Sequence, residues 1–194
     1  VDADDLMDEM IATAKQTTTE LGKANELEAS DAEKLFYQIG LGALKYFILK
    51  VDPKKTILFN PAESIDFSGN TGPFIQYTHA RIQSILRKAV DSGIDILQEI
   101  KLPEQLMEKE KVLLKVIHQF PATVVLAGEN RSPALIANYL YDLAREFNQF
   151  YQAEPILKEQ NEDQRNFRIQ LSKFTATIIR KAGGLLGMQM PEKM

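Results

Sequence analysis

Aromatic, amide and basic side chains are interleaved in one short stretch, where Phe74, Gln76, Tyr77, His79 and Arg81 lie within eight residues. Aromatic faces stack on unpaired nucleobases, while amide and guanidinium groups form hydrogen bonds with base edges. This composition favours a surface that binds single-stranded nucleic acid. His79 has two interpretations: it binds a ligand or, as is more usual for a histidine on a helix, it packs and forms hydrogen bonds inside the fold.

A glycine-containing loop, Gly69-Asn70-Thr71-Gly72-Pro73, leads directly into this stretch. Pro73 suits the first position of a helix, where its missing amide hydrogen costs nothing. Free amides and the dipole at a helix start can hold a phosphate, so the loop and its Asn70 are candidate contacts for a polyanion. The alternative is a tight loop before a helix that begins with proline, and the loop taken alone favours that alternative.

The residue types that most catalytic and metal sites need are missing. The chain has no cysteine and only two histidines, His79 and His118, which excludes disulfides and nearly excludes zinc sites of the usual kind. No G-x-S-x-G elbow is present, and the acids at positions 2, 4, 5 and 8 lack the glycine and final glutamate of a calcium loop. We therefore predict no catalytic residue, no metal site and no cofactor in this chain.

The elements that position the interleaved stretch are predicted to be helices. Apolar residues recur at helical spacing along most of the chain, and no alternating strand of convincing length is present. The predicted fold class is all-α, a bundle of about six or seven helices with one long connection at 51–72. Helices are expected over residues 3–27, 30–52, 73–90, 102–119, 121–127, 132–151 and 161–182.

Local patterns predict where some of these helices begin and end. Ser30 and Glu33 have the spacing of a capping box, which predicts a helix start at Ser30. Asn161, with a glutamine three residues later, predicts the start of the last long helix. Gly183-Gly184 predicts its end, because glycine readily takes the left-handed conformation that closes a helix.

Charge is distributed unevenly along a chain whose formal net charge is -4. Residues 1–33 hold ten acids and two bases, whereas residues 164–194 hold six bases and one acid. A polyanion would therefore be attracted to the C-terminal end of the chain. The alternative is a basic helix face that is simply solvated.

No segment is predicted to enter a membrane or to direct export. The most apolar run, residues 112–126, is too short for a span and contains Lys115, His118 and Pro121. The N-terminus VDADDLMDEM carries acids where a signal peptide has positive charge. It also lacks an initiator methionine, so we expect a piece of a longer protein, and the absence of cysteine fits the cytoplasm.

Four stretches are specific enough to identify a resemblance. Residues 64–88 contain G-N-T-G-P and Q-Y-x-H-A-R in register, 39–47 read IGLGALKYF, 141–157 contain F-N-Q-F-Y and P-I-L, and 185–194 read LLGMQMPEKM. Together they resemble the C-terminal DALR-type anticodon-binding domain of the arginyl-tRNA synthetases, over essentially the whole chain. One departure is that the tetrapeptide GALK, residues 42–45, replaces the letters that name the DALR motif.

The resemblance implies a class I synthetase that joins arginine to tRNA through an arginyl-adenylate, using ATP with magnesium. Neither the HIGH-type motif nor the KMSKS-like loop of that family is present. ATP chemistry is therefore expected in a missing catalytic domain, and this fragment alone is expected to be inactive. The implied partners are tRNA with an arginine anticodon and the protein's own catalytic domain, in a monomer. Residues 1–30 are expected to form a helical connector after the catalytic domain, and residues 31–194 the anticodon-binding bundle.

The resemblance also assigns roles to individual residues. An aromatic residue, a small residue one turn later and the terminal methionine line a pocket for an anticodon base in the family, and these positions correspond to Phe74, Thr78 and Met194. The family commonly has Tyr and Ala at the first two. Phe74 and Thr78 are four residues apart and share a helix face, with Tyr77 and Arg81 as the adjacent pair. The phosphate contacts expected beside the pocket are Arg81, Arg87, Lys88 and the basic last helix.

Two other functions remain open at this stage. One is a helical protein-interaction module, and the other is the equivalent domain of another synthetase, such as the glycine or cysteine enzyme. The Q-Y-x-H-A-R block argues against the second. Salt dependence separates RNA binding from a protein interface, because binding through several phosphates weakens steeply as salt rises.

Overall fold

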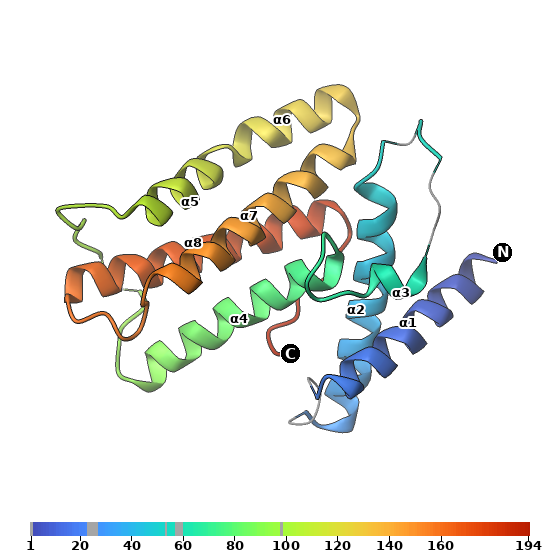
Figure 1. Ribbon diagram of the computed structural model, residues 1–194, viewed down its shortest axis with the longest axis horizontal. Coiled ribbons are helices and arrows are strands. Elements are labelled where there is room, and N and C mark those ends of the chain that lie inside the picture. Colours follow the sequence, from blue (N-terminus) through green and yellow to red (C-terminus); the bar gives the residue numbers. More distant parts are fainter. Residues whose placement is uncertain (1, 23–26, 53, 57–59, 98) are drawn as a thin grey trace.

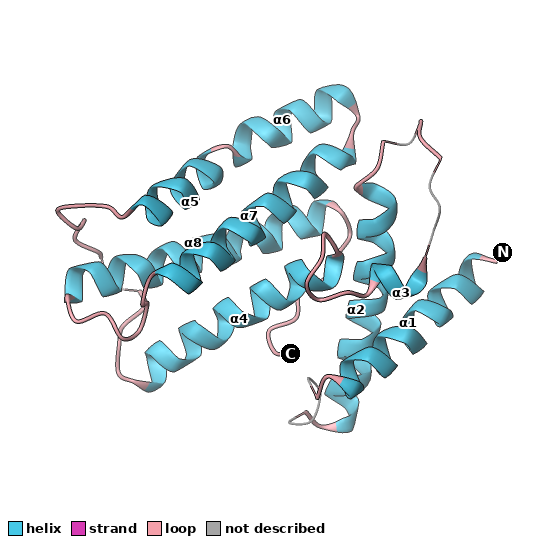
Figure 2. Cartoon of the chain, in the orientation of Figure 1, coloured by secondary structure: helices cyan, strands magenta, loops and turns pink. Residues whose placement is uncertain are grey.

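The fold is described by a computed structural model for residues 2–22, 27–52, 54–56, 60–97 and 99–194. All regular secondary structure in these ranges is helical, which confirms the predicted all-α class (Figure 2). Seven of the helices have 11 residues or more, and one short helix lies in the longest connection (Figure 1). In chain order they are α1 (Ala3–Glu20), α2 (Ala29–Leu49), α3 (Pro61–Ser64), α4 (Gly72–Asp91), α5 (Glu108–His118), α6 (Phe120–Asn130), α7 (Pro133–Ala153) and α8 (Glu162–Leu185).

Helix α7 lies at the centre of the larger part of the bundle (Figure 1). It packs against α4 and α8, and also against α5 and α6, which run along its other side. Leu140, Leu143 and Phe147 of α7 have no exposed surface and belong to the main hydrophobic core. The helix predicted over residues 132–151 therefore faces neighbours on several sides.

Helices α1 and α2 form a second, smaller hydrophobic cluster. Met10 and Ala14 of α1 are fully buried against residues of α2 that include Ile39 and Ala43. Gly40 permits the close approach, because a Cβ atom there would lie 2.8 Å from the backbone of Ile11. The beginning of the chain thus packs directly on the helix that follows it.

Two helix starts were predicted correctly from local patterns. Helix α4 begins with Pro73 in its first turn, and the Thr71 side chain caps it by accepting a hydrogen bond from the Phe74 amide at 3.3 Å. At the start of α8, the Asn161 side chain accepts from the Gln164 amide at 3.0 Å. Both caps are local, so the pattern of a few residues is enough to determine them.

The helix predicted to start at Ser30 is present, but the predicted capping box was wrong. Helix α2 begins one residue earlier, at Ala29, with Glu28 in the N-cap position and no side-chain cap. Glu33 does not return to Ser30, because its carboxylate lies 2.6 Å from the ammonium of Lys15 on α1. Contact with the neighbouring helix takes the place of the local capping box.

The predicted end of the last helix was also wrong. Gly183 and Gly184 both lie inside α8, which continues to Leu185, and the left-handed residue is Gly187 with φ of 68°. Gly183 lies against Met190 of the C-terminal segment, whose terminal methyl group would have to shift to admit a Cβ atom there. The C-terminal segment, residues 186–194, folds back along the bundle from this point (Figure 1).

The long connection before α4 is tied to the bundle at its second half. The Tyr46 hydroxyl lies 2.6 Å from the side-chain oxygen of Asn70, and Lys50 donates to the Asn70 carbonyl at 2.8 Å. Ile65 is buried, and the Phe67 ring meets Tyr77 edge-on with centroids 6.3 Å apart. Positions 57 and 59 of this connection lie outside the described residues.

Helices α5 and α6 are separated only by Gln119. Together, residues Glu108–Asn130 are long and apolar enough to cross a membrane by length and composition alone, so the expectation that this run is too short was wrong. One such segment does not by itself indicate a membrane protein, and Leu113 and Ile117 pack into the core that α7 shares. The outward side of α6 exposes Val125 and Leu126.

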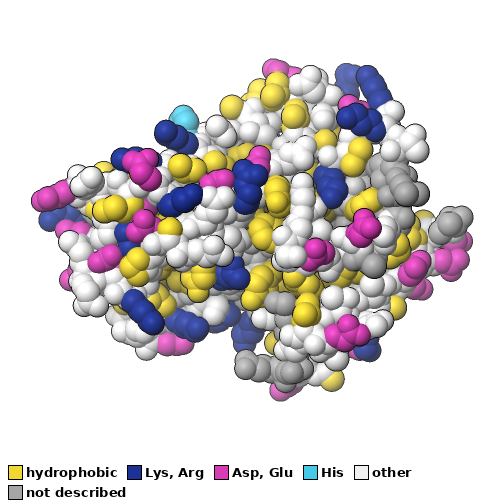
Figure 3. Space-filling model, viewed as in Figure 1, with side chains coloured by type: hydrophobic (Ala, Val, Ile, Leu, Met, Phe, Trp, Pro, Cys, Tyr) yellow, Lys and Arg dark blue, Asp and Glu magenta, His cyan; other side chains and the backbone are white. Residues whose placement is uncertain are grey.

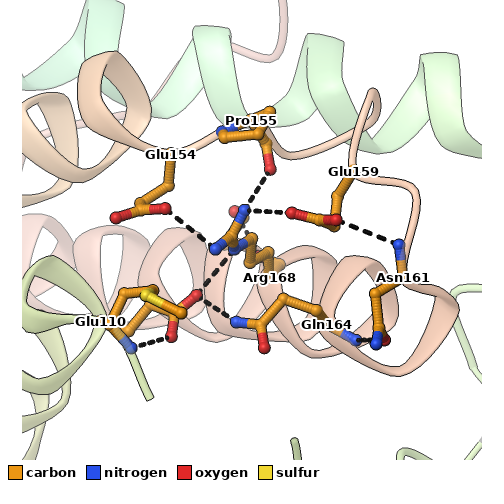
Figure 4. A network of polar contacts seen from close by, with 9 residues as sticks. Glu110, Glu154, Pro155, Glu159, Asn161, Gln164 and Arg168 are labelled. Atoms are coloured by element: carbon orange, nitrogen blue, oxygen red, sulfur yellow. Dashed lines mark hydrogen bonds and ion pairs between the residues drawn. The ribbon is translucent and has the colours of Figure 1, made fainter. Parts of the chain in front are cut away.

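A buried charge network joins α5, α8 and the end of α7 (Figure 4). The Arg168 guanidinium pairs with three carboxylates, at 2.7 Å from Glu110, 2.9 Å from Glu154 and 2.9 Å from Glu159. Glu110 is fully buried, and it also accepts from the side chain of Gln164. Because each ion depends on the others for compensation, the network fixes the start of α5 against α8.

Candidate nucleic-acid interface

A pocket of about 820 Å³ opens beside α4. One wall is the face of α4 that carries Tyr77 and Arg81, and Tyr151 at the end of α7 adds to it. The other walls come from residues just after α1, from Leu27 just before α2 and from the C-terminal segment. The described residues that line it are Leu21, Gly22, Leu27, Tyr77, Ala80, Arg81, Ser84, Ile85, Arg87, Lys88, Tyr151, Lys193 and Met194.

The described residues that line this pocket carry positive charge. Arg81, Arg87, Lys88 and Lys193 line it, and none of its described lining residues is an acid. On the face drawn in Figure 3, Lys and Arg side chains follow the edge of α4 toward the α1 and α2 pair. A concave site lined by one sign of charge raises the local concentration of ligands of the opposite sign. The predicted basic end of the chain contributes only Lys193 to it, because most of α8 packs elsewhere.

Arg81 is held between two aromatic rings. Its guanidinium carbon lies 4.8 Å from the ring centroid of Tyr77 and 5.3 Å from that of Tyr151. One terminal nitrogen of Arg81 donates to the side-chain oxygen of Asn148. Tyr77 and Arg81, predicted as a pair, are therefore brought together, and two residues of α7 complete the arrangement.

Phe74 and Thr78 lie on α4 outside this pocket. The half-buried Phe74 ring tilts against Tyr141, with centroids 5.6 Å apart. Thr78 is fully buried, and its hydroxyl donates to the Phe74 carbonyl at 2.9 Å and accepts from Asn148 at 2.7 Å. The structure therefore does not bring these two side chains and Met194 into one cavity.

Met194 lines the pocket because α4 docks the C-terminal segment. Gln76 donates to the Gln189 carbonyl at 2.9 Å, and Arg87 donates to the Glu192 carbonyl at 2.9 Å. Between them, Nδ1 of His79 lies 2.9 Å from the Pro191 carbonyl. These contacts set the path by which the chain reaches Met194.

Gln76 and His79 have no exposed surface, so the expectation that Gln76 reads a base edge was wrong. Burial lowers the pKa of His79 below its ordinary value, partly opposed by its hydrogen bond to Pro191 and by the nearby Glu192 carboxylate. The neutral imidazole thus donates through Nδ1 to a main-chain carbonyl. Of the two interpretations of His79, the structure shows the packing and hydrogen-bonding one.

The loop before α4 is closed rather than open to a phosphate. Gly72 and Pro73 are buried, and a Cβ atom at Gly72 would lie 2.6 Å from the carbonyl oxygen of Gly42. The Thr71 hydroxyl already caps the Phe74 amide. Asn70 is exposed as a residue, but its side-chain oxygen accepts from Tyr46. The tight-loop alternative thus describes this segment.

Asn148 and Tyr151 were not among the predicted site residues. Both lie about 70 residues away from Arg81 in the sequence, and a helical period cannot tell which neighbour a face meets. The signal was the polar asparagine in the F-N-Q-F-Y run, on a stripe that is otherwise apolar and aromatic. Within the described ranges, no group of three or more His, Cys, Asp or Glu side chains is placed to hold a metal ion.

Comparison with known proteins identifies a family that this chain matches. The family described as "DALR anticodon binding domain" matches residues 75–194. The chain is 56% identical over all 194 residues to an arginine–tRNA ligase of Bacteroides thetaiotaomicron, of which it covers 32%, and 54% identical to that of Flavobacterium psychrophilum, of which it covers 31%. It therefore spans about a third of the length of the curated relatives it matches.

Solved structures agree with the sequence relatives. The arginyl-tRNA synthetase of Thermus thermophilus superposes with a TM-score of 0.88 at 32% identity, covering 100% of this chain and 32% of that one. The Plasmodium falciparum arginyl-tRNA synthetase superposes with a TM-score of 0.84 at 27% identity, covering 100% of this chain and 34% of that one. The matched part of both enzymes has the all-helical fold described above.

Proposed function

The chain belongs to the DALR anticodon binding domain family, and from this premise we propose that it binds the anticodon arm of a tRNA with an arginine anticodon. The relatives at 56% identity are named arginine–tRNA ligases, which supports the choice of tRNA. The observation that carries the proposal is the positively charged pocket beside α4, with its aromatic rings around Arg81.

The pocket suits an unpaired base and its phosphates. Tyr77 and Tyr151, the two rings that hold Arg81, line it, and Met194 adds an apolar side chain that adapts to the shape of a base. Arg87, Lys88 and Lys193 would bind phosphates, which hold RNA in place without selecting its sequence. Phe74 would offer a second stacking surface outside the pocket, where the Thr78 hydroxyl would support it through the hydrogen bond to its carbonyl. Asn70 would hold the loop before α4 in place through Tyr46 and Lys50.

The activity of the intact protein is part of the same proposal. We infer an arginine–tRNA ligase that uses ATP with magnesium in a catalytic domain outside these residues, as a cytoplasmic monomer. Residues 1–30 would connect that domain to the bundle formed by residues 31–194. Met10 and Ala14 of α1 pack against α2, so such a connector would have a fixed position on the bundle.

The alternative of a protein-interaction module has one observation in its favour. Val125 is 60% exposed and Leu126 is 48% exposed on the outer side of α6, a helix that does not line the positively charged pocket. An apolar interface of that kind would bind a partner with little dependence on salt. The same salt series therefore separates the two functions.

The test is binding of labelled tRNA with an arginine anticodon, beside the same tRNA with its middle anticodon base changed, at two salt concentrations. We expect binding that weakens as salt rises and that drops when the base is changed. Equal binding of both tRNAs would leave only a scaffold that holds phosphates. Absence of binding, with helical content intact, would overturn the proposal for this chain on its own.

A further inference from the structure

A directional chain of hydrogen bonds runs from the pocket wall into α4. Arg81 donates to the side-chain oxygen of Asn148, whose amide nitrogen donates to the Thr78 hydroxyl at 2.7 Å and to the Ala144 carbonyl at 2.9 Å. Thr78 then donates to the Phe74 carbonyl at 2.9 Å. A single side chain from α7 thus links Arg81 and Thr78, two residues one turn apart on α4.

This network allows one orientation of the Asn148 amide. Arginine can only donate, so the amide oxygen must face Arg81. The Thr78 proton is used on the Phe74 carbonyl, so the Thr78 oxygen must accept from the amide nitrogen. Asn148 is only 9% exposed. A flipped amide would break hydrogen bonds at both ends and leave the freed polar groups largely buried, which is costly.

The rings fix the plane of the same guanidinium. Tyr77 and Tyr151 lie on Arg81 at 4.8 and 5.3 Å, and Asn148 holds one of its five N–H groups. Within the described residues, no carboxylate forms an ion pair with Arg81. The group therefore enters the pocket with a fixed position and plane.

A fixed guanidinium plane matters for binding a base edge and not for binding a phosphate. A phosphate can be bound by any nearby cation, and Arg87, Lys88 and Lys193 already line the pocket. A base edge requires paired donors in a defined plane, because its acceptors are coplanar. The aromatic rings and the amide would be superfluous for Arg81 if it served only to bind a phosphate.

We propose that Asn148 is a positioning residue that sets Arg81 to read the edge of a nucleobase in this pocket. The inference rests on the proposed function and adds to it the group that reads sequence and the residue that holds this group. Asn148 touches no RNA itself. Its effect on recognition is therefore expected to pass entirely through Arg81.

The test compares Asn148→Ala with Asn138→Ala, an exposed asparagine on the same helix. For each protein, the ratio of affinities for the arginine tRNA and the tRNA with a changed middle base is measured. We expect Asn148→Ala to lower this ratio about tenfold, the order of one lost arginine–base contact, and Asn138→Ala to leave it unchanged. An equal loss of affinity for both tRNAs would overturn the inference, because it would mean a structural role only.

Arg81→Lys completes the test, since it keeps the charge and removes the planar fork. We expect it to lower the ratio as much as Asn148→Ala does, and we expect Asn148→Ala to lower it no further in the Arg81→Lys background. Additive losses would overturn the inference. Full discrimination by Arg81→Lys would overturn it as well, even if Asn148→Ala failed to fold. Absence of discrimination by the wild-type chain would instead overturn the proposed function.

Discussion

Nδ1 of His79 lies 2.9 Å from the carbonyl oxygen of Pro191, a residue 112 positions later in the chain. The contact joins the middle of α4 to the segment that places Met194 in the pocket. Gln83 lies 3.2 Å from the other ring nitrogen, so both nitrogens of this buried imidazole have partners. The position of the C-terminal segment thus depends on a helix that also carries the pocket wall.

Replacement of His79 by alanine is expected to destabilise the fold and to loosen the C-terminal segment. It removes the hydrogen bond to Pro191 and leaves that carbonyl without its partner, which costs about 1–3 kcal/mol of unfolding free energy. Urea denaturation measures the loss. His118→Ala is the control, because His118 is exposed on α5. Equal stabilities of the two variants would contradict the docking role of His79.

Stability should fall as the solution is acidified through the range of His79. Burial lowers the pKa of His79 from its ordinary 6.5, the nearby Arg180 lowers it further, and the Pro191 carbonyl and Glu192 raise it. Below pH 6.5 the unfolded chain therefore takes up a proton that the folded chain does not, so the unfolding free energy decreases as pH falls. Urea denaturation at pH 7.5 and 5.5 should show a smaller decrease in His79→Gln than in the wild type, and an identical decrease would refute the assignment.

Two adjacent glycines of α8 should respond differently to alanine. Gly184 has open space around its Cβ position, so Gly184→Ala should stabilise the helix by up to about 1 kcal/mol. A Cβ atom at Gly183 would meet the terminal methyl group of the flexible Met190 side chain, which must shift, so Gly183→Ala should gain less than Gly184→Ala. Gly183→Ala should therefore be the less stable variant in thermal denaturation. The reverse order would show that the C-terminal segment does not pack as described.

Loss of Arg168 should be among the most destabilising single changes. Arg168→Met leaves the fully buried Glu110 without its cation, and removal of one partner of a buried pair costs about 3–5 kcal/mol. The exposed pair of Lys15 and Glu33, 2.6 Å apart, is the control, and Lys15→Met should cost less than about 1 kcal/mol. Similar losses in denaturant titrations would mean that water reaches the Arg168 network.

Lys88→Ala should weaken tRNA binding without changing which tRNA is preferred. If Lys88 contacts one phosphate, its loss lowers the affinity for both tRNAs alike and reduces the slope of log affinity against log salt by about one. Lys101→Ala is the control, because Lys101 is exposed and does not line the pocket. A loss confined to one of the two tRNAs would place Lys88 on a base instead.

Local features were predictable from the sequence, and long-range ones were not. The Thr71 and Asn161 caps and the turn chemistry before Pro73 each depend on a few adjacent residues. The capping box at Ser30 failed because Glu33 meets Lys15 of another helix. Periodicity correctly put Tyr77 and Arg81 on one face, but it could not supply Asn148, whose contact with Arg81 spans 67 residues.

The docking of the C-terminal segment has a consequence for how its sequence can vary. Lys45, Gln76 and His79 hold the carbonyls of residues 187, 189 and 191, and a carbonyl is the same in every amino acid. A substitution that keeps the buried positions apolar leaves these acceptors in place. A residue inserted or deleted between positions 187 and 191 shifts the acceptors that follow it by about 3.3 Å along the chain, out of reach of their donors. The number of residues between Gly187 and Pro191 is therefore under tighter constraint than their identities.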